Sequence, residues 1–328
     1  MRAAAYDRTG PAKDVLTLIE LPTPEPGPGE VRVRLATSGI NPSDVKTRGG
    51  TRTKVLAFPQ IVPHSDGAGV IDAVGAGVDS GRIGERVWTW NAAWGRPHGT
   101  AAQYIVLPSA QAVQLPERVD FAAGACLGIP ALTAYHAVVM DGGVKDKTVL
   151  VAGGAGAVGH YAIQFARLRG ARQIITTVSS QAKAQIALAA GADVTIDYRK
   201  EDVAARVLEL TNGAGVNRVI EVDLHANVKL DFAVTAANGD IVIYGSNVPE
   251  VPVNFVQGIT KNLQLRFFIV YNLTAADRAR ELAEFGELLA SGRLQHNVTD
   301  RFPLDRIAEA HERVESGQAG GNVVLDIS

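Results

Sequence analysis

The chain has 328 residues, of which 46% are hydrophobic and 20% charged, and its formal net charge is −2. This length favours two domains, and the composition is that of a folded globular protein. Basic residues are neither in excess nor clustered, which argues against nucleic-acid binding. The single cysteine, Cys126, excludes an internal disulfide and a zinc site built from several cysteines.

No segment has the character of an export signal or a membrane span. Asp7, Arg8 and Gly10 interrupt the alanines near the N-terminus before an apolar region develops. No stretch approaches the roughly 20 uninterrupted apolar residues that a spanning helix needs. We therefore expect a cytoplasmic protein with no membrane partner.

The first 120 residues have the pattern of a β-rich domain. Residues 31–35 alternate between apolar and basic side chains, as expected for a half-buried strand. Proline and glycine turns such as 26–29 separate this run from others. Further strands are predicted at 69–74, 86–90 and 102–107.

From about Phe121 the pattern changes to apolar strands that alternate with alanine-rich helices. This alternation predicts a parallel sheet wound on both faces. The predicted strands are 148–152, 174–178, 193–196, 216–222 and 240–244, and the predicted helices are 160–169, 181–190 and 203–210. An apolar stretch at 263–270, two helices at 275–289 and 304–315, and a terminal strand at 322–327 follow. We expect the terminal strand to return to the first domain.

A glycine motif lies between the first predicted strand of this second region and its helix. Gly154, Gly156 and Gly159 have the spacing of a dinucleotide-binding turn. In such a turn the first glycine allows the tight bend, the second lets the pyrophosphate approach, and the third lets helix and strand pack closely. The helix N-terminus then attracts the phosphates.

The end of the second strand favours NADPH over NADH. An NAD site normally has an acidic residue there to hold the ribose hydroxyl, but Thr177 to Lys183 contains no carboxylate. Ser179 and Lys183 suit a 2′-phosphate, and Tyr198-Arg199 after the third strand could add a phenol and a cation. The alternative is that Lys183 is an ordinary solvated charge.

Four motifs give the chain a family resemblance. They are Ser38-Gly39-Ile40-Asn41-Pro42-Ser43-Asp44, Ser65-Asp66-Gly67-Ala68-Gly69-Val70-Ile71, Gly128-Ile129-Pro130-Ala131-Leu132-Thr133-Ala134-Tyr135 and Ala189-Ala190-Gly191-Ala192-Asp193. Together they resemble the medium-chain dehydrogenase/reductase superfamily, and within it the quinone oxidoreductases of the ζ-crystallin type. The similarity extends to Gly321-Asn322-Val323-Val324-Leu325 and so covers essentially the whole chain.

The resemblance implies an α/β fold with two domains. A GroES-like, β-rich catalytic domain would comprise residues 1–121 and 268–328, and a Rossmann domain with a doubly wound parallel sheet would comprise 122–267. The cofactor would bind in a cleft between them, and the protein would be a homodimer.

The resemblance also implies a zinc-independent enzyme. Where zinc-dependent alcohol dehydrogenases of the superfamily carry a metal-binding Cys, a His and a second Cys, this chain has Asn41, Ser65 and Ile129. His64 lies one residue earlier, where quinone reductases usually have Gly, and a lone His is more often structural than a ligand. We therefore expect no metal ligand.

Family analogy gives the residues that would contact NADPH, from both domains. They are Asn41, Lys46, Thr133, Gly154, Ala155, Gly156, Ala157, Val158, Gly159, Thr176, Ser179, Lys183, Tyr198, Tyr244, Gly245, Ser246, Phe267, Phe268, Ile269 and Asn322. The large apolar side chains at Phe267 and Phe268 suit a flat acceptor but could equally be strand core.

The catalytic candidates are Asn41 and Lys46. Lys46 stands where the ζ-crystallin branch commonly has Tyr, as in some enone reductases, and this leaves the acceptor open between a quinone and an α,β-unsaturated carbonyl. Either residue could donate to the developing oxyanion, although Lys46 could also be a surface charge. Asp44 and Asp66 are expected to order loops. A non-catalytic NADPH-binding protein, structural or RNA-binding, is the alternative from another class.

Overall fold

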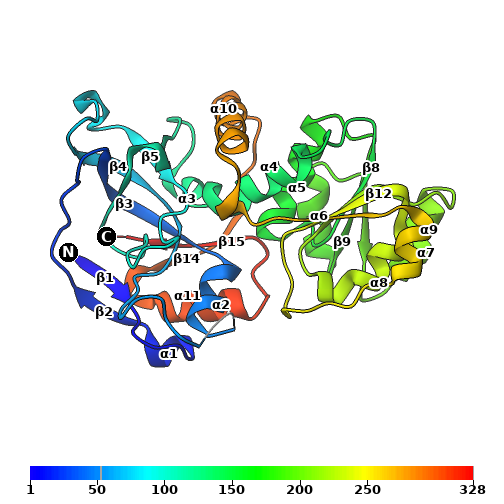
Figure 1. Cartoon of the computed structure of the whole chain (residues 1–328), viewed down its shortest axis with the longest axis horizontal. Coiled ribbons are helices and arrows are strands. Elements are labelled where there is room, and N and C mark those ends of the chain that lie inside the picture. Colours follow the sequence, from blue (N-terminus) through cyan, green and yellow to red (C-terminus); the bar gives the residue numbers. More distant parts are fainter. Residues whose placement is uncertain (52–53, 328) are drawn as a thin grey trace. The chain divides into compact units, whose positions relative to one another are not determined.

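The computed structural model describes residues 1–51 and 54–327, which form two compact units (Figure 1). The first unit contains Met1–Pro130 and the residues from Gly286 on, and the second contains Ala131–Phe285. Among the described residues, none of the helices combines the length and the apolar character needed to cross a bilayer.

The first unit is built on a seven-stranded sheet in which most neighbours are antiparallel. Along its long strand β3 (Glu30–Ile40), Val31, Val33 and Leu35 are buried while Arg34 is exposed, which is the predicted alternation. The other strands are β4 (Asp66–Val74), β5 (Arg86–Thr89), β6 (Tyr104–Pro108), β7 (Ala112–Gln114), β14 (Val298–Pro303) and β15 (Asn322–Asp326), in the order β14-β15-β3-β4-β5-β7 with β6 paired to β3.

The terminal strand returns to the first unit, as the sequence predicted. β15 pairs antiparallel with β3, with Val324 opposite Gly39. Gly39 has no room for a side chain, because a Cβ there would lie 2.0 Å from the carbonyl oxygen of Ala125. The C-terminal segment is therefore part of the same sheet as the N-terminal strands.

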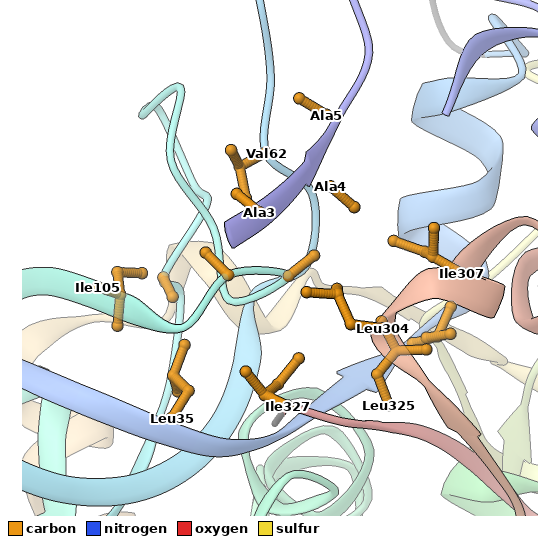
Figure 2. Close-up of a cluster of buried hydrophobic side chains, with 14 of the residues drawn as sticks. Ala3, Ala4, Ala5, Leu35, Val62, Ile105, Leu304, Ile307, Leu325 and Ile327 are labelled. Carbon is orange, nitrogen blue, oxygen red and sulfur yellow. The ribbon is translucent and has the colours of Figure 1, made fainter. Parts of the chain in front are cut away.

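One apolar cluster holds both ends of the chain in the first unit (Figure 2). It joins Ala3, Ala4 and Ala5 of β1 (Arg2–Ala5) to Ile307 of α11 (Ile307–Glu315). Each fully buried Leu, Ile or Val contributes about 1.5 to 3 kcal/mol relative to exposure. The remaining elements around this core are β2 (Thr17–Glu20), α1 (Ala12–Val15), α2 (Pro42–Arg48) and α3 (Phe121–Gly124).

The second unit is a doubly wound parallel sheet. Its six strands have the order β10-β9-β8-β11-β12-β13, which is the 3-2-1-4-5-6 order of dinucleotide-binding folds. The strands are β8 (Thr148–Val151), β9 (Gln173–Val178), β10 (Val194–Asp197), β11 (Val216–Glu221), β12 (Thr235–Ile243) and β13 (Gln264–Phe267). The helices are α4 (Leu132–Val139), α5 (Ala157–Leu168), α6 (Gln181–Ala189), α7 (Val203–Leu210), α8 (Leu224–Val234), α9 (Phe255–Lys261) and α10 (Ala275–Ser291).

The unit boundaries differ from the expected 121/122 and 267/268. The helical pattern starts at Phe121, yet α3 packs on β3 and β4 of the first unit. Most of α10 belongs to the second unit, where Glu281 is hydrogen-bonded to His136 at 2.7 Å and the Phe285 ring packs on Phe165. These contacts are between residues far apart in sequence, so the strand and helix pattern did not reveal them.

A chain of buried hydrogen bonds in the first unit has a single possible direction. The Thr100 hydroxyl donates to the Asp66 carbonyl at 2.6 Å, so Ser38 must donate to Thr100. Ser38 then accepts from Nδ1 of His64 at 2.9 Å. Because burial keeps both imidazoles neutral, Nε2 of His64 accepts from Nε2 of His311 at 2.8 Å, and each ring has a fixed tautomer.

Burial opposes protonation of this histidine pair. It lowers the pKa of His64 to about 3, and burial, with the charge of Arg48 nearby, lowers that of His311. His64 also has a φ of 79°, a conformation that favours glycine, and its ring contacts hold it there. The sequence expectation that His64 is structural agrees with this arrangement.

The pair predicts a loss of stability in mild acid. Between about pH 6.5 and pH 3 the unfolded chain binds protons that the folded chain does not. The free energy of unfolding therefore decreases as the pH is lowered through this range. At pH 5 the loss from His64 alone is about 2 kcal/mol. Denaturant unfolding at pH 7.5, 6 and 5 measures it, and His311→Gln should make the slope shallower. The exposed His98 provides the control, His98→Gln. Equal stability at pH 7.5 and 5 would contradict the assignment.

Candidate functional site

The glycine turn joins β8 to α5 at the carboxyl edge of the parallel sheet. Gly153 has a φ of 68°, so the left-handed bend falls one residue before the predicted Gly154. A Cβ on Gly154 would lie 2.1 Å from the Thr176 hydroxyl, and one on Gly159 would lie 2.3 Å from the Gly153 carbonyl oxygen. A Cβ on Gly156, the N-cap residue of α5, would meet only the Gly153 carbonyl oxygen, at 3.2 Å. The turn is thus packed tightly from behind and open at Gly156, where a phosphate can approach.

Two threonines hold this turn from the adjacent strand β9. The Thr177 hydroxyl accepts the Gly153 N–H at 3.0 Å, and the Thr176 hydroxyl donates to the Val151 carbonyl at 2.7 Å. Thr176 is completely buried. Its place behind the turn fits a supporting residue better than the direct cofactor contact that family analogy suggested.

The structure brings the predicted 2′-phosphate residues to one place. Ser179 follows β9, and Lys183 is half-buried in the first turn of α6, which Ser180 caps. The Tyr198 N–H donates to the Val178 carbonyl at 3.1 Å, and this bond ties the end of β10 to the end of β9. The exposed Tyr198 therefore lies beside Ser179.

The residues expected near the nicotinamide follow β12 and β13, at the same edge of the sheet. The rings of Tyr244 and Phe268 lie 6.4 Å apart, and Phe268 also packs on His136 at 4.7 Å. Phe267 is exposed, on the opposite face from Phe268, so the two phenylalanines do not act as one apolar wall. Ile269 is half-buried, as are Gly245 and Ser246.

Three further candidates lie in more enclosed positions. Thr133 is buried in the first turn of α4 in the second unit. Asn322 is buried at the start of β15 in the first unit, where its N–H and its side-chain amide both donate to the Asn297 carbonyl. Lys46 is half-buried on α2, also in the first unit.

Asn41 is fixed from two sides in the first unit. Its N–H donates to the Asp44 carboxylate at 2.8 Å, and its side-chain amide donates to Oδ2 of Asp66 at 2.8 Å. The same Asp66 oxygen accepts the Ile129 N–H at 3.0 Å. Asp44 and Asp66 thus order the loops around Asn41, as expected from the sequence.

Asp66 is a completely buried carboxyl, and its burial raises its pKa well above the ordinary range. Its second oxygen has no hydrogen-bond partner among the described residues. Gly128 approaches that oxygen so closely that a Cβ would lie 2.2 Å from it. Sequence reasoning gave Asp66 only a general ordering role, because the contact with Asn41 spans 25 residues.

The resemblance aligns three positions with the zinc ligands of related dehydrogenases, and the side chains there suit zinc poorly. Asn41, Ser65 and Ile129 offer an amide, a hydroxyl and a hydrocarbon, and the Asn41 amide is already bonded to Asp66. Within residues 1–51 and 54–327, no group of three or more His, Cys, Asp or Glu side chains could hold a metal ion.

Comparison with known proteins gives matches over both units. Residues 27–117 match the alcohol dehydrogenase GroES-like domain family, and residues 157–290 match the zinc-binding dehydrogenase family. The chain is 32% identical to a quinone oxidoreductase of Pseudomonas aeruginosa, over 98% of this chain and 97% of the relative. It is 30% identical to a 2-haloacrylate reductase of a Burkholderia species, over 99% and 98%.

A solved structure shows the same architecture. The Escherichia coli quinone oxidoreductase complexed with NADPH superposes with a TM-score of 0.88 at 27% identity, and the match covers 99% of this chain and 100% of that one. The similarity therefore extends through both units.

Proposed function

This chain belongs to the medium-chain dehydrogenase/reductase superfamily, and we propose that it is an NADPH-dependent reductase that transfers a hydride to a quinone or a similar conjugated carbonyl without zinc. The observation that carries the proposal is the end of β9, where Ser179, Lys183 and Tyr198 gather with no carboxylate among Thr177 to Lys183. The quinone oxidoreductase relatives and the NADPH complex support it.

The second unit suits a dinucleotide. Gly156 leaves backbone N–H groups open at the N-terminus of α5, and this site favours the pyrophosphate. Ser179 and Tyr198 can donate hydroxyl hydrogen bonds to a 2′-phosphate, and Lys183 can add a charge-assisted one. NADPH, when bound, supplies the hydride.

The first unit supplies the groups proposed to act on the acceptor. Asp66 accepts from the Asn41 amide and so fixes which way that side chain points. Asn41 then has one remaining amide proton for an acceptor oxygen, and Lys46 offers an ammonium on the next helix turn. A reduced quinone delocalises its charge, so solvent can protonate it, whereas an enone depends more on such donors.

A second acceptor class is an α,β-unsaturated carbonyl. Lys46, in place of an aromatic side chain, favours it because an ammonium stabilises a localised oxyanion better than a ring does. The 2-haloacrylate reductase relative reduces a conjugated acceptor by name, which also supports this class.

The proposal includes a cytoplasmic homodimer. The single cysteine, which is buried, suits a reducing compartment. β13 lies at one edge of the parallel sheet, and four large apolar side chains around it and α9 are exposed: Phe255, Val256, Ile259 and Phe267. An exposed apolar patch of this kind favours association with a second copy.

Lys183→Ala tests the cofactor assignment. The change should raise KM for NADPH by about ten- to hundredfold, the effect of losing one charge-assisted hydrogen bond, and leave KM for NADH nearly unchanged. Steady-state kinetics with both cofactors measures it, and Lys229→Ala removes an exposed lysine of the same unit as a control. If the unmodified enzyme used NADH and NADPH equally well, the NADPH assignment would fail.

Assays of NADPH with a quinone or an enone, and of NADP⁺ with an alcohol, test the reaction, and Lys46→Met tests the acceptor. This variant keeps most of the stem and removes the donor. Enone reduction should fall by about a hundredfold, and quinone reduction much less. Lys13→Met, at an exposed position of α1, is the matched control. An equal loss for both acceptors through a higher KM for NADPH would make Lys46 a cofactor contact instead.

Phe255→Glu tests the dimer. Light scattering of the unmodified protein should give twice the 34.6 kDa mass of one chain, and the variant should give a single chain because a carboxylate cannot be buried unpaired in an apolar interface. Leu18→Glu, at an exposed apolar position of the first unit, should leave the mass unchanged. A monomeric unmodified protein would refute the dimer.

A further inference from the structure

Two acidic side chains are buried together below the carboxyl edge of the parallel sheet. Glu221 is the last residue of β11, and Asp231 lies on α8, the helix that follows it. They are 0% and 1% exposed, and the two carboxyls interact, because the charge of Glu221 contributes to raising the pKa of Asp231. Neither belongs to the glycine turn or to the phosphate end of the site.

The partners of the two carboxyls differ. One oxygen of Glu221 accepts the Asp223 N–H and the side-chain amide of Asn227, the latter at 3.0 Å. The other Glu221 oxygen and both Asp231 oxygens have no further donor among the described residues. Glu221 is therefore the anion, because two N–H groups already stabilise its charge, and Asp231 is the acid that donates to it.

The charged groups around the pair do not neutralise it. Asp223 and Tyr244, which interact electrostatically with Glu221, are themselves acids. Lys261 on α9 donates to the carbonyls of Phe232, Ala233 and Thr235 at the end of α8, and Arg218 on β11 is paired with Asp240. Two carboxylates buried side by side cannot both ionise, so the pair holds one proton.

Glu221 stands at the base of the turn expected to contact the cofactor. Its carbonyl accepts the Tyr244 N–H at 3.2 Å, and the Leu224 N–H donates to the Gly245 carbonyl at 3.0 Å. The Asn247 N–H donates to the Asp223 carboxylate at 3.0 Å. Gly245 lies so close that a Cβ would be 2.1 Å from the Val222 carbonyl oxygen. These contacts join the turn after β11 to the turn after β12.

We propose that Glu221 and Asp231 are positioning residues for the cofactor: they share one proton, and the resulting hydrogen bond holds the turn after β11 and, through it, Tyr244, Gly245 and Ser246 in the shape that binds NADPH. The inference rests on the proposed function, in which that turn contacts NADPH. It assigns no proton transfer to the substrate.

Removing the shared proton should loosen the turn. Burial and the charge of Glu221 raise the pKa of Asp231 to about 9, whereas an unfolded Asp titrates near 3.8. Between these values the folded chain holds a proton that the unfolded chain lacks, so this pair lowers stability as pH rises. Above about pH 9 both carboxyls become charged and repel each other.

Two substitutions of Asp231 distinguish the loss of its hydrogen-bond donor from the loss of its titrating group. Asp231→Asn keeps an N–H donor toward Glu221 but does not titrate, and Asp231→Leu provides neither. Glu209→Gln, at an exposed acid of α7, is the matched control. The dissociation constant for NADPH is measured by fluorescence titration from pH 6.5 to pH 10, and unfolding without cofactor is measured over the same range.

For the unmodified protein and for Glu209→Gln, the dissociation constant for NADPH should rise about tenfold between pH 8 and pH 10. This rise is expected when binding requires a proton on a group that titrates near pH 9. Asp231→Asn should bind NADPH as tightly at pH 7 and show no rise. It should also be more stable than the unmodified protein, by a larger margin at pH 8 than at pH 5. Asp231→Leu should bind at least tenfold more weakly at pH 7.

A rise that persists in Asp231→Asn, or a loss of affinity in Asp231→Asn equal to that in Asp231→Leu, would overturn the proposal. Unfolding separates this failure from that of the proposed function. If no variant binds NADPH while the stability of Asp231→Asn still grows with pH relative to the unmodified protein, the proton pair exists but the cofactor assignment is wrong. If both the binding and the stability effects are absent, the pair itself is refuted.

Discussion

The absence of a side chain at glycines that pack against neighbouring oxygen atoms is the constraint on which the rest of the structure depends. Gly154 packs against Thr176, Gly245 against the Val222 carbonyl, and Gly128 against Asp66. A Cβ at any of these positions would lie between 2.1 and 2.2 Å from an oxygen atom, a distance that real Cβ atoms do not reach. These close approaches bring the loops of each unit near enough for hydrogen bonds to fix them, so local packing determines the geometry of each candidate site.

Each unit buries charged groups as well as neutral ones. In the first unit His64 and His311 are hydrogen-bonded, and the buried Arg48 is paired with Glu315. In the second unit Arg218 is paired with Asp240, and Glu221 and Asp231 are buried together. Charged pairs in a low-dielectric interior depend strongly on geometry. In the second unit, these charged groups lie at the sheet that carries the glycine turn. The geometry of their contacts therefore also shapes the loops expected to bind the cofactor.

Sequence patterns predicted the parts of the fold that depend on neighbours along the chain. The five predicted strands of the parallel sheet and the return of the terminal strand to the first unit are confirmed, and α7 has the predicted bounds. The helix α8 was not predicted, because its apolar positions show little helical periodicity. The glycine motif was recognised, but the left-handed residue is Gly153, outside the motif.

The candidate site was predictable only where a motif carried it. Asn41 and the end of β9 were found in this way. The partnership of Asp66 with Asn41, of His64 with His311 and of Glu221 with Asp231 joins residues that are 25, 247 and 10 positions apart. No periodic pattern connects such pairs, because they meet only when strands and helices pack. Family analogy suggested Thr176 as a cofactor contact. In the structure Thr176 is fully buried, and its hydroxyl supports the glycine turn by donating to the Val151 carbonyl.

The distribution of these contacts explains how relatives with different names can share one architecture. The glycine turn and its threonines are fixed by backbone contacts within one sheet, so changing any of them disturbs the fold itself. Lys46, by contrast, is a side chain on a short helix whose start is held by Asn41 and Asp44. Its identity can change without altering those hydrogen bonds. Under the proposed role of Lys46, acceptor preference can diverge at this position while cofactor binding is retained. This is the relation expected between a quinone oxidoreductase and a 2-haloacrylate reductase that both match this chain over nearly its whole length.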